Sequence, residues 1–499
     1  MKPSPWKKTY LALDFGASSG RAVLGRLERG KMAIEEIHRF VNGPVQMNGT
    51  LFWDILALWN NVVEALKIAA AKGCVELDGI GVDTWGVDFG LIGADGHLLG
   101  NPVHYRDART AGVEKDILAA MDPATFYRVT GSPLFSVSTL CQLVGYRKRG
   151  GGATLASARA LLMMPDLFRY FLCGEEGCDL TIAGSSQLLD IHANRWSGRM
   201  LKAFHIPRRI MARLVEPGTV AGPLRPDVCA ATGVRSAPVI VVAGHDTPSA
   251  AAAVPCIEKD TAFLSCGSWA VVGVVSKKPV AHEKAMALGF VNETGFRSNI
   301  FVKNMMGLYL FELLHRSLNA GGRKVTYAQM VKDAAVAKPF GCLLNVNDPA
   351  FFATEDVAAT AKAYLKKSGR KGALRTESLI RALLEGVAFN CREALDDLET
   401  LTGRTIRRFF AVGGGIQNRL LCQFIANATG REVIAGPSEA TVVGNLAIQA
   451  LATGELRDAD EIRALAAASF PLARYQPQAR DRWEEQYRLY IEHLAAPRA

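Results

Sequence analysis

Several patterns that would place the chain in a particular protein class are missing from the sequence. Its ten cysteines include no Cys-x-x-Cys pair, and the closest two, Cys173 and Cys178, lie in a turn rich in Gly and Glu. This excludes the usual zinc spacing and a secreted disulfide framework, and favours free buried thiols in a reducing compartment. No apolar run approaches the roughly 20 residues that span a bilayer, and the first apolar stretch reaches Asp14 too soon for a signal peptide. We therefore expect a cytoplasmic protein without a membrane partner.

Three signatures of nucleotide and metal sites are also absent. No Gly-Lys-Ser or Gly-Lys-Thr occurs, which excludes a Walker phosphate loop, and no His-Glu-x-x-His occurs, which excludes the corresponding zinc helix. The glycine run Gly413–Gly415 is followed by Asn418 where the dinucleotide fingerprint needs its third glycine. This argues against a dinucleotide-dependent oxidoreductase, although a strand–glycine–helix junction can still receive a phosphate or a flat ring.

Charge is not concentrated in any one region of the chain. Lys and Arg outnumber Asp and Glu by 58 − 48 = 10, and the densest basic cluster is the short Arg147–Arg149. A nucleic-acid groove needs a longer basic stripe with interleaved aromatic residues, so we expect no nucleic-acid partner and only a mild attraction for anionic ligands. With 49% apolar and 21% charged residues the chain is too hydrophobic for intrinsic disorder, and 499 residues are too many for one core. We expect two large domains.

Two similar strand–turn–strand units lie about 250 residues apart, half the chain. Leu13–Ser18 and Leu264–Trp269 occupy equivalent places in these units, each at a small-residue turn between two apolar runs. This predicts a fold duplicated at domain scale, with domains at 1–253 and 254–499. Further strands are predicted at 79–82, 87–92, 238–243 and 409–412, a hairpin turn at 94–96, and helices at 53–74, 379–402, 418–430 and after the N-cap Thr247.

Residues that can bind phosphate and a cation follow the turn of each unit. Asp14 ends the first strand and Arg21 follows the glycine- and serine-rich turn. Backbone N–H groups of such a turn can surround a phosphate, the acid can hold a hydrated Mg²⁺, and the guanidinium can meet phosphate oxygens. Gly267 and Ser268 offer a second phosphate loop from the other half. An ordinary glycine-rich hairpin is the alternative for both units.

Two further clusters suit a sugar and its activation. Asp246 ends the buried strand 238–243 beside a helix start, where a carboxylate stays ionised and can accept a proton from a hydroxyl. The alternative is that Asp246 only caps the helix. His245 can add a hydrogen-bond donor. The Asp83–Asp88 segment combines two acids with Trp85, which suits the hydroxyl edges and apolar face of a polyol, but also a half-buried hairpin with satisfied acids.

Taken together, these segments resemble the FGGY carbohydrate kinases, from Tyr10 to about Leu456. The Asp83–Phe89 segment is typical of members that act on L-rhamnulose and differs from that of xylulose and glycerol kinases. The residues that carry the resemblance are Asp14–Arg21, Ile37–Phe40 with Asn42 and Gly43, Asp83–Phe89, Tyr105–Asp107 with Arg109 and Thr110, Met164–Asp166, Gly244–Thr247, Lys303–Leu308 and Gly413–Asn418.

The resemblance implies an α/β fold with two actin-like ATPase domains, each with a ribonuclease-H-like core, flanking a central cleft. It implies transfer of the γ-phosphoryl group of ATP, with Mg²⁺, to the 1-hydroxyl of L-rhamnulose, a small ketose. The residues expected to bind ATP are Ala17, Ser18, Ser19, Gly20, Arg21, Ser268, Glu312, Gly413 and Gly414. Those expected to bind the sugar are Gly86, His245, Asp246, Thr247 and Asn304, joined by Asp83 and Trp85 from the cluster above, with Asp246 as proton acceptor.

Two residues depart from the family pattern. Ser268 stands where the family often shows Thr, which keeps the hydroxyl, and Glu312 stands where a nucleotide-contacting Gln is expected. A carboxylate near phosphates is repulsive, so Glu312 conflicts with that role. Another ketose kinase, such as an L-fuculose kinase, is the alternative within the family. A non-enzymatic actin-like ATP-binding protein would keep both phosphate loops but would not need Asp246. The sequence leaves the oligomeric state open, a homo-oligomer included.

Overall fold

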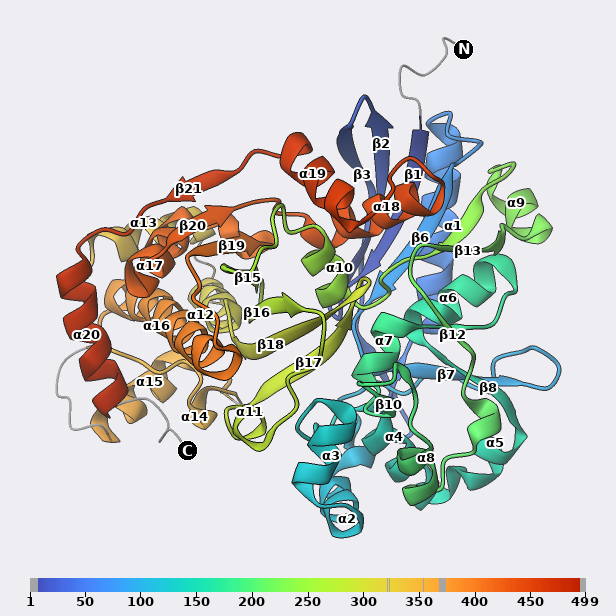
Figure 1. Cartoon of the computed structure of the whole chain (residues 1–499), viewed down its shortest axis with the longest axis horizontal. Coiled ribbons are helices and arrows are strands. Elements are labelled where there is room, and N and C mark those ends of the chain that lie inside the picture. The colour runs from blue at the N-terminus through green and yellow to red at the C-terminus, as the bar shows by residue number, and fades with distance from the viewer. Residues whose placement is uncertain (1–7, 321, 323, 353, 368–373, 494–499) are drawn as a thin grey trace.

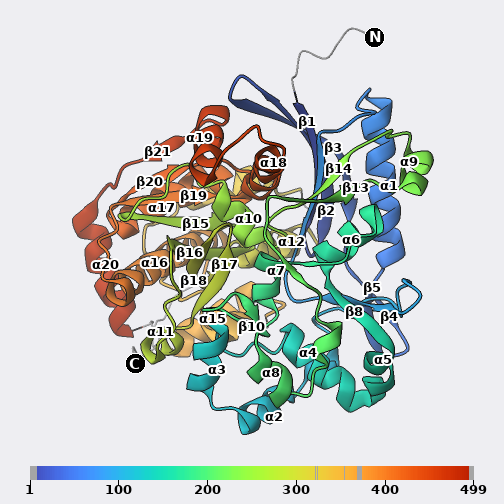
Figure 2. The same cartoon turned by 45° about the vertical axis from the view of Figure 1, so that its right-hand side comes forward.

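The chain folds into two α/β halves, each built around a mixed β-sheet (Figures 1 and 2). The computed structural model describes residues 8–320, 322, 324–352, 354–367 and 374–493. The first sheet has the order β13-β14-β6-β1-β2-β3 and the second β17-β18-β16-β15-β19-β20-β21. The strands of the first sheet are β1 (Lys8–Phe15), β2 (Ser19–Glu28), β3 (Lys31–Val41), β6 (Gly79–Thr84), β13 (Thr219–Pro223) and β14 (Pro238–Val241), and those of the second are β15 (Thr261–Cys266), β16 (Trp269–Ser276), β17 (Phe290–Gly295), β18 (Ser298–Met306), β19 (Arg408–Val412), β20 (Glu432–Ala435) and β21 (Ala473–Tyr475).

The two sheets repeat one topology. In the first sheet β1 pairs antiparallel with β2 and parallel with β6. In the second sheet β15 pairs antiparallel with β16 and parallel with β19. The correspondence reaches the far edge, because β13 runs antiparallel to β14 and β21 runs antiparallel to β20. The duplication that the two short sequence units predict is therefore present in the strand order of the whole sheets.

Helices lie around both sheets (Figure 1), and the short strand pairs of the described residues belong to the first half. The helices of the first half are α1 (Ile55–Ala71), α2 (Val113–Ala120), α3 (Pro123–Thr130), α4 (Thr139–Tyr146), α5 (Gly152–Ser157), α6 (Met164–Cys173), α7 (Leu180–Ser185), α8 (Gly198–Ala203), α9 (Pro226–Thr232) and α10 (Asp246–Ala252). Those of the second half are α11 (Glu283–Ala287), α12 (Tyr309–Asn319), α13 (Tyr327–Val336), α14 (Pro349–Phe352), α15 (Val357–Lys367), α16 (Thr376–Thr402), α17 (Arg419–Thr429), α18 (Ala440–Ala452), α19 (Ala459–Ser469) and α20 (Arg480–His493). The short strand pairs are β4 (Pro44–Met47) with β5 (Thr50–Trp53), β7 (Phe89–Gly93) with β8 (Ala158–Met163), β9 (Cys178–Asp179) with β12 (Leu214–Val215), and β10 (Leu189–Asp190) with β11 (Arg195–Trp196). Within the described part of the chain, no helix has the length and hydropathy needed to cross a membrane.

Helices α10 and α18 each pack against the sheet of the other half. α18 follows β20 of the second sheet, yet its Leu446 packs in a buried cluster with Tyr10 of the first sheet. α10 follows β14 of the first sheet, yet its Ala250 packs in a buried cluster with Phe263 of the second sheet. The two helices also contact one another, and Figure 1 shows α18 over the strands of the first sheet. Each half thus completes part of the core of the other.

Local signals set the ends of the helices, whereas strand partners depend on the whole fold. Asp54 is the N-cap of α1, as predicted, and accepts a hydrogen bond from the N–H of Ala57 at 3.0 Å. The N-cap of α10 is His245 and not the predicted Thr247. The turn predicted at 94–96 forms and closes a short hairpin, in which Ile92 and Leu98 make an antiparallel bridge. The Gly93 N–H donates to the His97 carbonyl at 2.8 Å and the Leu99 N–H to the Leu91 carbonyl at 2.9 Å. Along its length β7 also pairs with β8, which was not predicted.

Candidate functional site

The ends of three neighbouring strands bring predicted site residues to one edge of the first sheet. Asp14, near the end of β1, is paired in register with Asp83 of β6. Thr84, the last residue of β6, forms a bridge with His245, which follows β14. Since Asp246 comes next and begins α10, the three acids Asp14, Asp83 and Asp246 lie at the edge where open α/β sheets place their ligands.

The turn Ala17–Gly20 is held in place from outside. The backbone N–H of Asn42 donates to the Ser18 carbonyl at 3.1 Å, and the Asn42 side-chain amide donates to the Gly16 carbonyl at 2.8 Å. Ser18 is exposed, whereas Gly20 is buried against the ring of Phe40, which leaves no room for a side chain. The turn therefore has a fixed backbone and an accessible face, which are the features that a phosphate loop needs.

Arg21 joins the turn Ala17–Gly20 to the second half. Its Nε donates to Asp14 Oδ2 at 2.8 Å, and its Nη1 donates to Glu439, the residue before α18. Burial lowers the pKa of the Arg21 guanidinium, but the two carboxylates outweigh this and raise the pKa, so the side chain stays a cation. A phosphate at the loop would compete with Glu439 for this guanidinium.

Asp83 lies beside Asp14 in the protein interior. Its Oδ2 accepts a hydrogen bond from Asn445 Nδ2 of α18 at 2.6 Å, while its Oδ1 is buried and has no partner within the described residues. Burial first, and then the charge of Asp14, raise the pKa of Asp83 well above its ordinary value. The contact of Asp83 with the sugar stays a prediction, and the structure places the carboxyl in the interior beside Asp14. A buried carboxyl next to a second carboxylate is better suited to a cation than to a hydroxyl.

The indole N–H of Trp85 is already used inside the protein. It donates to Asp88 Oδ2 at 3.0 Å, and the same oxygen accepts a hydrogen bond from Trp53 Nε1 at 2.6 Å. Gln142 donates to Asp88 Oδ1 at 2.8 Å, and burial raises the pKa of Asp88 to about 6. Asp88 is thus a satisfied interior acid, as the alternative interpretation of this segment states. Trp85 retains only its ring for a ligand.

Gly86 passes close beneath His245. A Cβ atom on Gly86 would lie 3.2 Å from His245 Nε2 and 3.1 Å from the Cβ of Ser185, so a glycine keeps this approach open. The next residue, Val87, has a φ of 70°, which is rare for a β-branched residue. Its N–H donates to Ser185 Oγ at 3.0 Å and its carbonyl accepts from Thr139 Oγ1 at 2.6 Å. A strained backbone held in this way is typical of functional sites.

His245 lies between two carboxylates that come from different halves. Its Nε2 is 3.5 Å from Asp246 Oδ1, and its Nδ1 is 3.6 Å from Oε2 of Glu293 on β17. Asp246 Oδ1 accepts hydrogen bonds from the N–H and the hydroxyl of Thr247, at 2.6 and 3.2 Å. The Asp246 side chain is nevertheless 43% exposed. Its carboxylate therefore has a fixed orientation and remains accessible to a substrate.

The glycines of the second half lie against the end of β15. β15 and β19 pair in parallel as far as Ser265 and Val412, so the loops that follow them are neighbours. Gly413 has a φ of 88°, and a Cβ there would lie 2.8 Å from the Cys266 carbonyl oxygen. Gly414 has no atom within 4 Å of the corresponding position. The junction therefore has one face packed on the end of β15 and one face open.

Glu312 is the partner of Ser268. The Ser268 hydroxyl is 3.1 Å from each Glu312 carboxylate oxygen, and Glu312 lies in the first turn of α12, where the helix favours a negative charge. Asn304 is exposed on β18 opposite Val271, and within the described residues its side chain forms no hydrogen bond. The structure therefore places Asn304 on the second sheet and does not join it to Gly86 or His245.

The acids of the first sheet fit a cation that arrives with a ligand. Within the described residues, no group of three or more His, Cys, Asp and Glu side chains could hold a metal ion by itself. Mg²⁺ at kinase sites usually takes one or two carboxylates and completes its shell with phosphates and water. The adjacent Asp14 and Asp83 fit this requirement, since Asp83 Oδ1 is buried without a partner.

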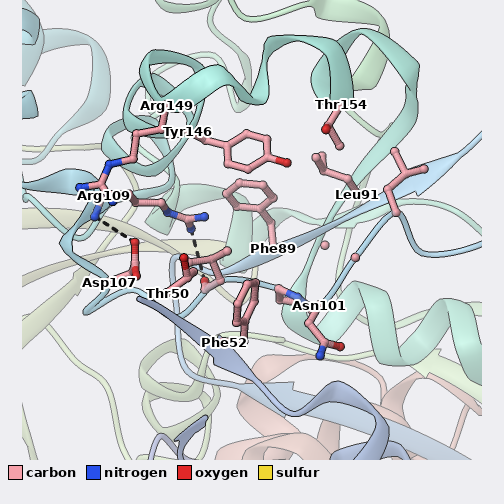
Figure 3. A pocket seen from close by; sticks show the side chains of 15 residues that line it. Thr50, Phe52, Phe89, Leu91, Asn101, Asp107, Arg109, Tyr146, Arg149 and Thr154 are labelled. Carbon is pink, nitrogen blue, oxygen red and sulfur yellow. Dashed lines mark hydrogen bonds between the residues drawn. The ribbon is translucent and has the colours of Figure 1, made fainter. Parts of the chain in front are cut away.

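A cavity of about 390 Å³ lies apart from these residues, in the first half (Figure 3). Asp107 and Arg109, which belong to the family motif, line it, but none of the predicted site residues does. Buried Arg109 donates to Gln142 Oε1 at 2.5 Å, and Gln142 in turn donates to Asp88. Arg109 therefore orients Gln142, which binds Asp88, the hydrogen-bond acceptor of Trp85.

Three residues at the site were missed by the sequence reasoning. Glu293 lies on β17, a strand whose residues are all buried although Asn292, Glu293 and Thr294 are polar, and this burial cannot be seen in the sequence. Glu439 and Asn445 reach the first half only because α18 packs on the first sheet. No pattern near them in the sequence points to Arg21 or Asp83.

Comparison with known proteins defines the class. The model for the N-terminal domain of the FGGY family of carbohydrate kinases matches residues 9–253, and the model for the C-terminal domain matches residues 262–453. The chain therefore belongs to the FGGY family of carbohydrate kinases, and the resemblance seen in the sequence is confirmed. More narrowly, it is 38% identical to the rhamnulokinase of Bacteroides thetaiotaomicron, with 96% of this chain and 98% of the relative covered. It is 35% identical to the rhamnulokinase of Enterococcus faecalis, with 94% of each covered.

Solved structures of more distant kinases share the fold. A xylulose kinase from Lactobacillus acidophilus matches with a TM-score of 0.80 at 17% identity, covering 97% of both chains. A glycerol kinase from Plasmodium falciparum with ADP matches with a TM-score of 0.78 at 14% identity, covering 98% of this chain and 99% of that one. At these identities the match shows the fold alone, and it confirms the predicted two-domain α/β architecture.

Proposed function

We propose that this protein is an ATP- and Mg²⁺-dependent kinase that phosphorylates the 1-hydroxyl of L-rhamnulose in rhamnose breakdown. The observation that carries the proposal is the orientation, exposure and position of the Asp246 carboxylate. Its carboxylate is oriented by Thr247, partly exposed, and placed at the sheet edge that also carries Asp14 and the first phosphate loop. The rhamnulokinases of Bacteroides thetaiotaomicron and Enterococcus faecalis support the choice of sugar.

In the proposed reaction Asp246 accepts the proton of the sugar 1-hydroxyl. The hydroxyl oxygen forms a bond to the γ-phosphorus of ATP, the bond between that phosphorus and the β,γ-bridging oxygen breaks, and ADP leaves. Phosphoryl transfer needs little covalent chemistry from the protein, so alignment and charge neutralisation provide most of the rate increase. His245 and Gly86 orient the sugar beside Asp246.

The nucleotide would lie between the loops of the two halves. Ala17–Arg21 would bind its phosphates from the first half, and Ser268 and Gly414 would face it from the second. Asp14 and Asp83 would hold Mg²⁺, which supplies neutralisation of the phosphate charge. Asn304 lies on the strand next to β16, which begins directly after Ser268, so we assign it to the nucleotide side in place of the sugar side.

A coupled ADP-release assay with a panel of ketoses tests the proposal. L-rhamnulose is a 6-deoxy ketose whose one primary hydroxyl is on the first carbon, and the ring of Trp85 offers an apolar surface for its methyl group. A wrong epimer leaves a buried polar group unpaired, which costs about 1–3 kcal/mol, or roughly ten- to a hundredfold in rate. We expect the highest kcat/KM with L-rhamnulose, slower turnover of L-fuculose and L-xylulose, and no turnover of glycerol.

The same assay decides between the alternatives. A higher kcat/KM for L-fuculose than for L-rhamnulose would make the protein an L-fuculose kinase. If no ketose were phosphorylated, the kinase proposal would be rejected. Omission of Mg²⁺ should abolish turnover, and carbon NMR of the product should place the phosphate on the first carbon.

A further inference from the structure

Glu293 and His245 form an incomplete contact between the two halves. Glu293 lies on β17 of the second sheet and is buried, and His245 follows β14 of the first sheet. Glu293 Oε2 and His245 Nδ1 are 3.6 Å apart, and each is buried without a hydrogen-bond partner among the described residues. Hydrogen bonds between N–H and O span about 2.7–3.2 Å. An approach of roughly 0.5 Å would therefore satisfy both atoms at once.

The strand that carries Glu293 is attached to the first half. The Tyr127 hydroxyl of α3 donates to the Phe290 carbonyl at 2.9 Å, and the Asn292 N–H donates to the Gly131 carbonyl at 2.7 Å. Both contacts tie β17 to the end of α3, directly before Glu293. They keep Glu293 opposite His245 while leaving the short remaining distance to be closed by a small movement.

The charges around Glu293 favour a partner at His245. Burial raises the pKa of Glu293, the His245 side chain lowers it, and Asp246 raises it. A buried acid of this kind is destabilising unless a donor meets it. His245 Nδ1 is the nearest basic atom that the structure offers, at 3.6 Å.

We propose that Glu293 is a positioning residue for phosphoryl transfer, acting through His245 across the junction of the two halves. This inference rests on the proposed function, since it assigns a task to Glu293 within that same reaction. Glu293 accepts a hydrogen bond from the Nδ1–H of His245 and so fixes the rotation of the ring. Nε2 then faces Gly86 and Asp246, to which the proposed function assigns the sugar hydroxyl. A small approach of β17 to His245 completes this contact.

Two substitutions of Glu293 and one of its neighbour Thr294 distinguish a positioning role of Glu293 from a role in packing. Glu293→Met fills the space without an acceptor, and we expect kcat to fall roughly ten- to a hundredfold while the KM for ATP stays constant. Glu293→Gln keeps an acceptor oxygen, and we expect it to restore kcat to within about fivefold of the wild type. The control is Thr294→Val on the same strand, whose hydroxyl has no partner within the described residues, and it should behave like the wild type. Wild-type kcat in Glu293→Met would overturn the proposal.

The tautomer of His245 provides a readout that packing alone would not change. In protein labelled with ¹⁵N-histidine, with the His245 signal assigned from a His245→Gln variant, we expect a ring protonated at Nδ1. Glu293→Met should shift that population. A neutral ring protonated only at Nε2, with and without ligands, would overturn the proposal even if Glu293→Met failed to fold. This measurement needs no turnover, so it still tests the contact if no ketose proves to be a substrate and the proposed function fails.

Discussion

Asp246 is the residue on which the proposed chemistry depends, and its neighbours allow a clean substitution. Asp246→Asn keeps the size of the side chain and the oxygen that accepts from Thr247. Since only the proton acceptor is lost, we expect kcat to fall by roughly two to four decades with little change in sugar affinity. Steady-state kinetics and calorimetric titration with L-rhamnulose measure the two quantities. Asp54→Asn, in which one good N-cap replaces another, is the control, and near-normal turnover in Asp246→Asn would remove the base assignment.

Glu312 is one of the two residues at which the sequence departs from the expected family pattern, and its charge has a measurable consequence. The carboxylate accepts a hydrogen bond from the Ser268 hydroxyl, which we propose as a phosphate ligand. Glu312→Gln keeps an acceptor for that hydroxyl and removes a like charge. Removing about 0.5–1 kcal/mol of repulsion lowers the KM for ATP by roughly two- to fivefold, and we expect this change with kcat unaffected. An increased KM would show that Glu312 contributes a favourable contact to the nucleotide.

At the scale of elements, the strand–glycine–helix junction after β19 offers two adjacent glycines with different surroundings. Gly413→Ala forces a side chain to a φ of 88° and toward the Cys266 carbonyl. We expect the free energy of unfolding to fall by at least about 1–2 kcal/mol. Gly414→Ala meets no atom within 4 Å, so it should keep the Tm of the wild type but raise the KM for ATP. Thermal unfolding and ATP kinetics test the pair, and equal Tm values for both variants would contradict this assignment.

Individual helices and strands also show which parts of the structure can be predicted from the sequence and which cannot. The strand–turn–strand units, the Asp54 cap and the end of α16 at Gly403 were predictable because they depend on residues a few positions apart. The partner of β7 and the surroundings of Asp83 were not. Asp83 faces Asp14 because of strand register, and its hydrogen-bond donor Asn445 lies 362 residues away in the sequence. A pattern can place an acid at a strand end, but packing decides whether it meets a sugar or a second acid.

At the scale of the whole molecule, α10 and α18 connect the two sheets to the site, because each helix packs on the sheet of the other half. α10 begins with Asp246 and packs on the second sheet, while α18 follows Glu439 and packs on the first. Both helices therefore carry site residues at positions where the two halves meet. A relative movement of the two sheets can therefore change the distances between site residues such as Arg21 and Glu439.

The proposed function assigns one nucleotide to loops of both halves, so we expect ligands to draw the halves together and make the protein more compact. Sugar and nucleotide together stabilise the closed arrangement by their better binding to it, and closure limits ATP hydrolysis by water. We expect solution scattering to show a smaller radius of gyration with L-rhamnulose and a non-hydrolysable ATP analogue than without ligands. The Asp246→Asn variant with L-rhamnulose and ATP itself is the matched control, because it binds both substrates but turns them over slowly. It should show the same decrease. An unchanged radius in both samples would mean that the loops already have their final separation, and that His245 and Glu293 do not depend on closure for their contact.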